Sequence, residues 1–148
     1  KVLRKAKINE LPQLFNILFG QMSVVGPRPL VDSEVAMYPD NIRELVYDKN
    51  QPGLTGIGSL FFRDEDEIIA RAGKPSEEAY ERDIMPVKGA LEVWYREHKS
   101  LRVDAKIVYL TAWAVVRPAS VPLVESFRHE SGFPAPVLGA YDRLSGET

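Results

Sequence analysis

The segment Gly26-Pro27-Arg28-Pro29 constrains the fold most, because it cannot be helical and it interrupts the chain early. Pro29 pushes Arg28 into an extended backbone state, Pro27 fixes its own φ, and Gly26 permits a close approach of another backbone. The segment therefore predicts a stiff loop that carries one guanidinium, a group suited to two-point contacts with phosphate. A structural loop whose arginine pairs with a local carboxylate explains the same residues equally well.

The segments on either side of this loop have helical periodicity. The spacing predicts a helix that begins near Asn9 as N-cap, holds Pro12 in its first turn and ends at Gly20. Ser100 is the expected N-cap of a last helix, and Asp40 is expected to cap a helical piece after Pro39. The other predicted elements are a strand at 23–25, helices at 33–49 (interrupted at Pro39), 64–72, 76–84, 86–98 and 101–116, and a turn-rich loop at 52–58 before a short apolar run at 60–62.

We therefore expect a mixed α/β fold, mostly helical with little sheet. We divide the chain into a domain over 1–117 and a Pro/Gly-rich tail over 118–148. The four prolines and scattered glycines of the tail predict an extended or poorly ordered segment. Such a tail could exchange onto a second copy, which leaves a homo-oligomer open.

Composition excludes several classes of function. Lys+Arg is 19 and Asp+Glu is 21, so the 148-residue chain has a net charge of −2 and is a poor candidate for binding nucleic acid. The chain has no Cys, which excludes disulfides and thiolate zinc sites. It has two His, so a metal site built from several histidines is disfavoured. The longest apolar stretch, Ile107 to Val116, is shorter than a membrane span needs. Because the first residue is Lys1 and not Met, we expect a fragment of a longer protein.

The pair Asn9-Glu10 is a candidate site because it lies at a predicted helix N-terminus. Free N–H groups and the helix dipole attract phosphate there, and a carboxylate could instead hold a metal that binds phosphate. Simple helix capping is the better interpretation of the spacing alone.

The triplet Asp64-Glu65-Asp66 contains an Asp-x-Asp pattern, which some nucleotide-sugar transferases use to hold a divalent cation. No strand-rich nucleotide-binding half precedes it, and it opens a predicted helix. An acidic first turn is therefore the better interpretation. Arg63, directly before it, is a second candidate for contacting phosphate.

Two groups of apolar side chains could face a membrane or form the core. One is the stripe from Ile8 to Met22, beside four cations in Lys1 to Lys7 that either meet lipid headgroups or are solvated. The other is a set of aromatic residues that suits an interfacial belt or ordinary core packing, Trp94, Tyr95, Tyr109 and Trp113.

Three ordered motifs resemble the bacterial sugar transferases, the monotopic phosphoglycosyl transferases that initiate exopolysaccharide and O-antigen synthesis. The motifs are Ile8 to Leu14, Gly20 to Pro29, and Pro52 to Gly56. The resemblance covers roughly residues 1–116 and extends to later positions, namely Trp94-Tyr95, Ser100-Leu101, Asp104 and Thr111.

The resemblance implies transfer of a sugar-1-phosphate from a nucleoside diphosphate sugar to undecaprenyl phosphate, with Mg²⁺. It implies a monotopic, membrane-associated catalytic domain among lipids at the cytoplasmic face of the bacterial inner membrane. Glu10 would bind Mg²⁺, Asn9 would stand at the position of a catalytic Asp that attacks the β-phosphate, and Arg28 would contact phosphate. Arg63 and Arg4 are the further expected phosphate-binding residues.

The chain departs from the family pattern at Asn9, because an amide is a poor nucleophile and forms no ordinary acyl phosphate. Three explanations are open. Another group replaces the aspartate nucleophile, with Glu10 the nearest candidate; the sugar-phosphate is transferred directly to the carrier; or the protein is impaired. The alternative function is therefore a non-catalytic relative that binds nucleotide sugar or partner enzymes at the membrane. The second departure is that the family's N-terminal membrane segment is missing from this sequence.

Overall fold

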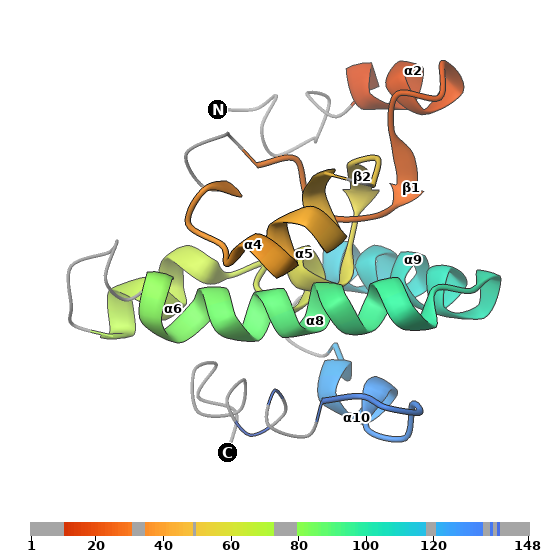
Figure 1. Ribbon diagram of the computed structural model, residues 1–148. Coiled ribbons are helices and arrows are strands. Elements are labelled where there is room, and N and C mark those ends of the chain that lie inside the picture. The colour runs from red at the N-terminus through yellow and green to blue at the C-terminus, as the bar shows by residue number, and fades with distance from the viewer. Residues whose placement is uncertain are drawn as a thin grey trace.

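The computed structural model describes residues 11–30, 35–48, 50–72, 80–117 and 121–134, together with 137 and 139. The secondary structure of these residues consists of helices and one two-stranded sheet, so the expected mixed α/β fold with little sheet is confirmed (Figure 1). In chain order the elements are α2 (Leu11–Leu18), β1 (Ser23–Val25), α4 (Asp40–Ile42), the π-helical turn η2 (Arg43–Asp48), β2 (Gly53–Thr55), α5 (Ile57–Phe61), α6 (Glu65–Ala72), the π-helical turn η3 (Tyr80–Ile84), α8 (Met85–His98), α9 (Leu101–Val116) and α10 (Leu123–Phe127).

The two long helices α8 and α9 supply much of the core. Leu91 of α8 and Ile107 of α9 are completely enclosed, and Phe61 of α5 packs into the same cluster. The Ser100 side chain accepts a hydrogen bond from the Val103 N–H at 3.4 Å, so the predicted cap and the predicted bounds of this last long helix are confirmed. α8 crosses the front of the molecule in Figure 1, with the sheet on one side and α10 on the other.

The two helices predicted on either side of Pro86 are present. η3 ends at Ile84, as predicted, and α8 begins at Met85, one residue before its predicted start, so the two elements follow each other without a gap. Pro86 lies in the first turn of α8, where its missing N–H has no intrahelical partner to lose.

The loop predicted for residues 52–58 is also wrong in part. β2 pairs in parallel with β1, with Ser23 opposite Gly53 and Val25 opposite Thr55, and α5 follows after Gly56. The strand predicted at 23–25 is confirmed. Three-residue strands and a five-residue helix carry little periodicity, so tertiary contacts rather than local sequence decide these elements.

Asp40 does not cap the helical piece after Pro39. Pro39 is the N-cap residue and Asp40 is the first residue of α4, with no side-chain cap hydrogen bond. The Asp40 carboxylate pairs with the guanidinium of Arg43 one turn later. This exposed pair occupies the carboxylate that we expected at the cap.

Residues 121–134 fold onto the core, which corrects the expectation of an extended or poorly ordered tail. Leu123 and Phe127 of α10 are buried, and the Phe127 ring lies 5.7 Å from that of Phe61 and 5.9 Å from that of Trp94. Lys106 of α9 donates to the Ser126 carbonyl oxygen at 3.0 Å and also pairs with Glu130. The division of the chain at residue 117 stays a prediction.

The two apolar groups of the sequence separate into core and surface. Trp94 and Tyr95 are core residues, so the interfacial interpretation is wrong for them, whereas Tyr109 is half exposed. On α2 and just after it the exposed apolar side chains are Leu14, Phe15, Leu18 and Phe19, while Met22 is buried. Across the described ranges, the helices are too short or too polar for any of them to span a bilayer.

Candidate active site

The loop that carries Arg28 is held by backbone hydrogen bonds on both sides of Pro27. The Gly26 N–H donates to the Thr55 carbonyl oxygen at 2.9 Å, and the Gly53 N–H donates to the Pro27 carbonyl oxygen at 2.8 Å. Arg28 follows directly and is exposed. Within the described part of the chain it has no carboxylate at ion-pair distance. The loop therefore presents a guanidinium that the described carboxylates leave open to a ligand.

Glycines are required where the two motifs meet. A Cβ at Gly53 would lie 2.2 Å from the Gly26 nitrogen, and a Cβ at Gly56 would lie 2.1 Å from the Gly26 oxygen. Neither neighbour can move without breaking the strand pairing, because both are backbone atoms. The close approach that Gly26 permits is thus the approach of the Pro-Gly-Leu-Thr-Gly segment to the Arg28 loop.

The later motif positions brace this sheet from α8 and α9. The Tyr95 hydroxyl donates to Asp104 Oδ1 at 2.6 Å and lies 3.3 Å from the Val25 carbonyl oxygen. The Thr55 and Thr111 hydroxyl oxygens are 2.8 Å apart. Burial and the neighbouring Asp104 raise the pKa of Tyr95, so its hydroxyl stays protonated and able to donate. These contacts explain why the sequence pattern spans segments far apart in the chain.

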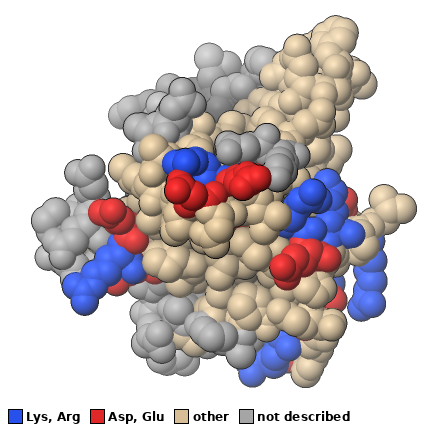
Figure 2. Space-filling model, in the orientation of Figure 1, with Lys and Arg blue, Asp and Glu red and all other residues tan. Residues whose placement is uncertain are grey.

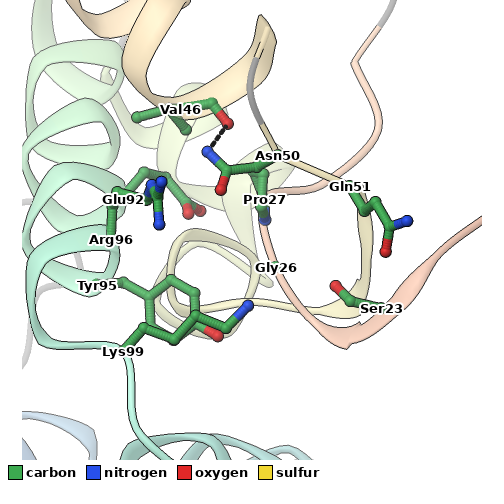
Figure 3. A pocket seen from close by; sticks show the side chains of 10 residues that line it. All are labelled: Ser23, Gly26, Pro27, Val46, Asn50, Gln51, Glu92, Tyr95, Arg96 and Lys99. Carbon is green, nitrogen blue, oxygen red and sulfur yellow. Dashed lines mark hydrogen bonds between the residues drawn. The ribbon is translucent and has the colours of Figure 1, made fainter.

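Two cavities flank Pro27 and Asn50. One opens beside Arg28 and is lined also by Tyr47 and Pro52. The other, which we call the Glu92 cavity, lies between α8 and the two strand-loop segments (Figure 3). Its lining residues are Ser23, Gly26, Pro27, Val46, Asn50, Gln51, Glu92, Tyr95, Arg96 and Lys99.

Glu92 is a buried carboxyl group on the wall of this cavity. Its Oε1 accepts a hydrogen bond from the Gly58 N–H at 3.1 Å, in the first turn of α5. Its Oε2 is buried and has no hydrogen-bond partner among the described residues. Burial raises the pKa of Glu92 to about 7, and the Gly58 N–H and the Lys88 cation oppose that rise. Lys88 itself pairs with Glu65 at 2.7 Å.

The structure describes two of the five residues predicted for the site. Arg4, Asn9 and Glu10 lie outside the described residues. Arg28 lines the cavity described above. Arg63 donates from Nε to Asp64 Oδ2 at 2.8 Å and from Nη1 to the Ala114 carbonyl oxygen at 3.2 Å, so it links the start of α6 to the end of α9.

Asp64 and Glu65 form no metal centre with other described residues, and the side chain of Asp66 lies outside the described part of the structure. Asp64 pairs with Arg63, and Glu65 pairs with Lys88. Among the described residues no group of three His, Cys, Asp or Glu side chains could hold a metal ion. Glu65 lies in the first turn of α6, as the acidic-turn interpretation predicted.

Sequence reasoning missed Glu92 and the other residues of its cavity. A signal was present, because Lys88, Glu92 and Tyr95 share the helical spacing of the buried position Leu91. Charged side chains are almost never fully buried unless they are paired, so a Lys and a Glu on a buried helical face indicate a specific environment. Asn50 and Gln51 carried no such signal, since their placement depends on the strand pairing.

Comparison with known proteins identifies the class to which this fold and loop belong. Residues 1–118 match the bacterial sugar transferase family, and the chain belongs to that family. It is 37% identical over 114 residues to the exopolysaccharide production protein ExoY of Sinorhizobium fredii, covering 77% of this chain and 42% of the relative.

Two further relatives have names that state a reaction. The UDP-glucose:undecaprenyl-phosphate glucose-1-phosphate transferase of Klebsiella pneumoniae is 36% identical over 76% of this chain and 22% of its own length. The undecaprenyl-phosphate galactose phosphotransferase of Salmonella typhimurium is 32% identical over 79% of this chain and 21% of its own. The chain thus matches less than half of each of these three relatives.

Proposed function

We propose that this chain acts in the transfer of a sugar-1-phosphate from a nucleoside diphosphate sugar to undecaprenyl phosphate. An oxygen of the carrier phosphate would replace the nucleoside monophosphate at the β-phosphorus, directly or in two steps. The observation that carries the proposal is the exposed Arg28 on a loop locked by β1–β2 pairing. The names of two relatives, which pair undecaprenyl phosphate with a sugar phosphate, support the same reaction.

Arg28 would hold the donor diphosphate. The hydrogen bonds on both sides of Pro27 fix the loop before any ligand arrives, so binding loses little backbone entropy. A guanidinium can then stabilise the charge that develops on the phosphate oxygens during transfer.

Mg²⁺ is the proposed cofactor, with Glu10 as its protein ligand. Mg²⁺ is commonly held by one or two carboxylates together with substrate phosphates. When bound, the ion would act as a Lewis acid and neutralise phosphate charge.

Asn9 leaves a second candidate function, a non-catalytic relative that binds nucleotide sugar or partner enzymes at the membrane. An amide cannot form the acyl phosphate that a carboxylate nucleophile would give. Direct transfer to the carrier needs no such intermediate, so the enzyme proposal does not depend on a carboxylate at this position.

The exposed apolar side chains of α2 support a site at the membrane surface. Residues 11–27 contain no Lys, Arg, Asp or Glu. The projection at the upper right of Figure 2, where Figure 1 shows α2, likewise has no charged side chain on this face. Such a surface suits the lipid interface where a polyprenyl carrier resides, and we propose the cytoplasmic face of the bacterial inner membrane.

The test is an assay of the complete protein in detergent, with undecaprenyl phosphate, Mg²⁺ and a panel of nucleoside diphosphate sugars. Release of a nucleoside monophosphate with formation of a lipid diphosphate sugar supports the enzyme. Release of the nucleoside diphosphate would indicate ordinary glycosyl transfer. Binding of a donor without turnover would favour the non-catalytic relative.

A further inference from the structure

The Glu92 cavity has the shape and position of a small-molecule subsite beside Arg28. Its volume is about 120 Å³, several times what one water needs. It shares Pro27 and Asn50 with the cavity that Arg28 lines, so a ligand whose phosphates contact Arg28 could extend into it. The wall is built from α8 on one side and from the segments after β1 and before β2 on the other (Figure 3).

Hydrogen-bond acceptors line the interior of this cavity. Glu92 Oε2 is buried without a partner among the described residues, which costs free energy unless a ligand or water donates to it. Asn50 Nδ2 donates to the Leu45 and Val46 carbonyl oxygens at 2.8 Å each. These two bonds fix the orientation of the amide, and its Oδ1 lies on the cavity side in Figure 3.

Cationic side chains lie at the exposed edge of the cavity. Arg96 and Lys99 both line it and both are exposed, in contrast to the enclosed Glu92. Acceptors inside and cations outside match a ligand that has hydroxyl groups at one end and phosphate at the other. A plain anion would fit the edge but would be repelled by an ionised Glu92.

We propose that the Glu92 cavity binds the sugar of the donor, with Glu92 and Asn50 accepting hydrogen bonds from its hydroxyl groups. The inference rests on the proposed function, since it names the place of the sugar in that same donor. The contrasting interpretation is that Glu92 only caps α5 through Oε1 and that water fills the cavity.

Glu92→Gln separates these two roles. The amide oxygen can still accept from the Gly58 N–H, while the other position changes from an acceptor to an N–H₂ donor. The experiment uses the complete protein at pH 8, and the probes are the tightest-binding nucleoside diphosphate sugar of the panel and the corresponding sugar-free nucleoside diphosphate. Calorimetry gives the two dissociation constants.

We expect Glu92→Gln to weaken binding of the nucleoside diphosphate sugar about tenfold or more, as for a buried site that loses a hydroxyl partner. Binding of the sugar-free diphosphate should change less than twofold, and the melting temperature should not fall, because the amide variant carries no buried charge at this pH. Glu130→Gln is the matched control, because it alters a largely buried carboxylate that pairs with Lys106 on the α10 side. Equal effects on both ligands, or no effect on either, would overturn the inference.

Deoxy analogues of the sugar on the unaltered protein provide a second measurement that needs no variant. Removal of one hydroxyl group should weaken binding about tenfold, and in Glu92→Gln the same removal should matter little. If every hydroxyl can be removed without loss, no hydroxyl is held and the inference fails. If no nucleoside diphosphate or nucleoside diphosphate sugar binds at all, the proposed function fails first, and the inference with it.

Discussion

Arg28 has an exposed side chain on a backbone that hydrogen bonds hold in place. A change of this side chain should therefore affect ligand binding and leave the stability of the fold unchanged. Lysine would keep the charge but lose the planar two-point contact. Arg28→Lys should therefore weaken donor binding or transfer by about 1–3 kcal/mol, the range of a charged hydrogen bond. The melting temperature without ligand should barely move, because the side chain is exposed. Arg102→Lys, at another exposed arginine, is the control. A large loss of ligand-free stability would make Arg28 a structural brace.

Asn9 stands where the family resemblance implies a catalytic aspartate, and the two side chains differ only in an amide nitrogen that replaces a carboxylate oxygen. Both residues cap helices well, so Asn9→Asp should fold normally. In the complete protein it should transfer sugar-phosphate faster or accumulate a phosphosugar adduct visible by intact mass, because a helix N-terminus favours the ionised carboxylate. Glu10→Gln should abolish activity in either background. Slower turnover of Asn9→Asp without an adduct would argue for direct transfer.

Glu92 should make the unfolding free energy depend on pH, and the variant Glu92→Gln should lack this dependence. Burial raises the pKa of this carboxyl group from its ordinary value of 4.5 to about 7, against the lowering effect of Lys88. Between these values the folded state binds the proton more tightly than the unfolded chain does, so stability falls as the pH rises. The difference corresponds to about 3 kcal/mol across that window.

Urea unfolding from pH 4.5 to 8 measures this effect. We expect the unaltered protein to lose stability relative to Glu92→Gln as the pH rises through this range. Tyr95 also interacts electrostatically with Glu92, but its raised pKa keeps it protonated throughout this range. Parallel profiles of the two proteins would mean that Glu92 is not enclosed as described.

At the residue scale, the site was predictable where backbone chemistry dictates the conformation. Pro27, Arg28 and Pro29 specify a stiff cationic loop by themselves. Glu92 was not predicted, because its importance depends on Gly58 and on the strands that close the cavity. Those contacts join positions that local sequence reasoning treats separately.

Among the elements, α2 and the residue after it carry a cluster of exposed apolar side chains, Leu14, Phe15, Leu18 and Phe19. Phe15 and Phe19 are 60% and 76% exposed. Changing both to Ser should weaken binding to vesicles that contain anionic lipids, measured by flotation, and should leave the unfolding free energy nearly unchanged. Leu101→Ser, at an 89% exposed position of α9, is the control. Unchanged vesicle binding with a collapse of stability would make these side chains core.

Apart from the three-residue strand β1, the elements predicted correctly are those with enough residues to show a period and a clear boundary. α9 has a serine cap at one end and an Arg-Pro pair after the other, and both of its bounds were predicted. β2 and α5 were not, since three and five residues show no period. Their structure comes from the pairing with β1 and from burial of Ile57 and Phe61.

For the whole molecule, the main question is whether the residues after 117 belong to the folding unit. The family match ends at residue 118, yet Phe127 is completely buried against the ring of Phe61 in α5. Lys106 on α9 also lies 5.3 Å from the centre of the Phe127 ring. These contacts tie α10 to both a short and a long helix of the domain.

Phe127→Ala should therefore destabilise the chain by about 3–5 kcal/mol, the cost of removing a large core side chain. The measurement is the urea unfolding free energy at fixed pH, with Phe19→Ala as the matched control. That control truncates a 76% exposed phenylalanine and should change stability by about 0.5 kcal/mol or less. A loss at least as large should follow when the chain is ended after residue 117, because the contacts of Leu123 and Glu130 disappear together with those of the Phe127 ring. If Phe127→Ala costs no more than the control, α10 is an appendage, and residues 1–117 are the folding unit that the sequence alone suggested.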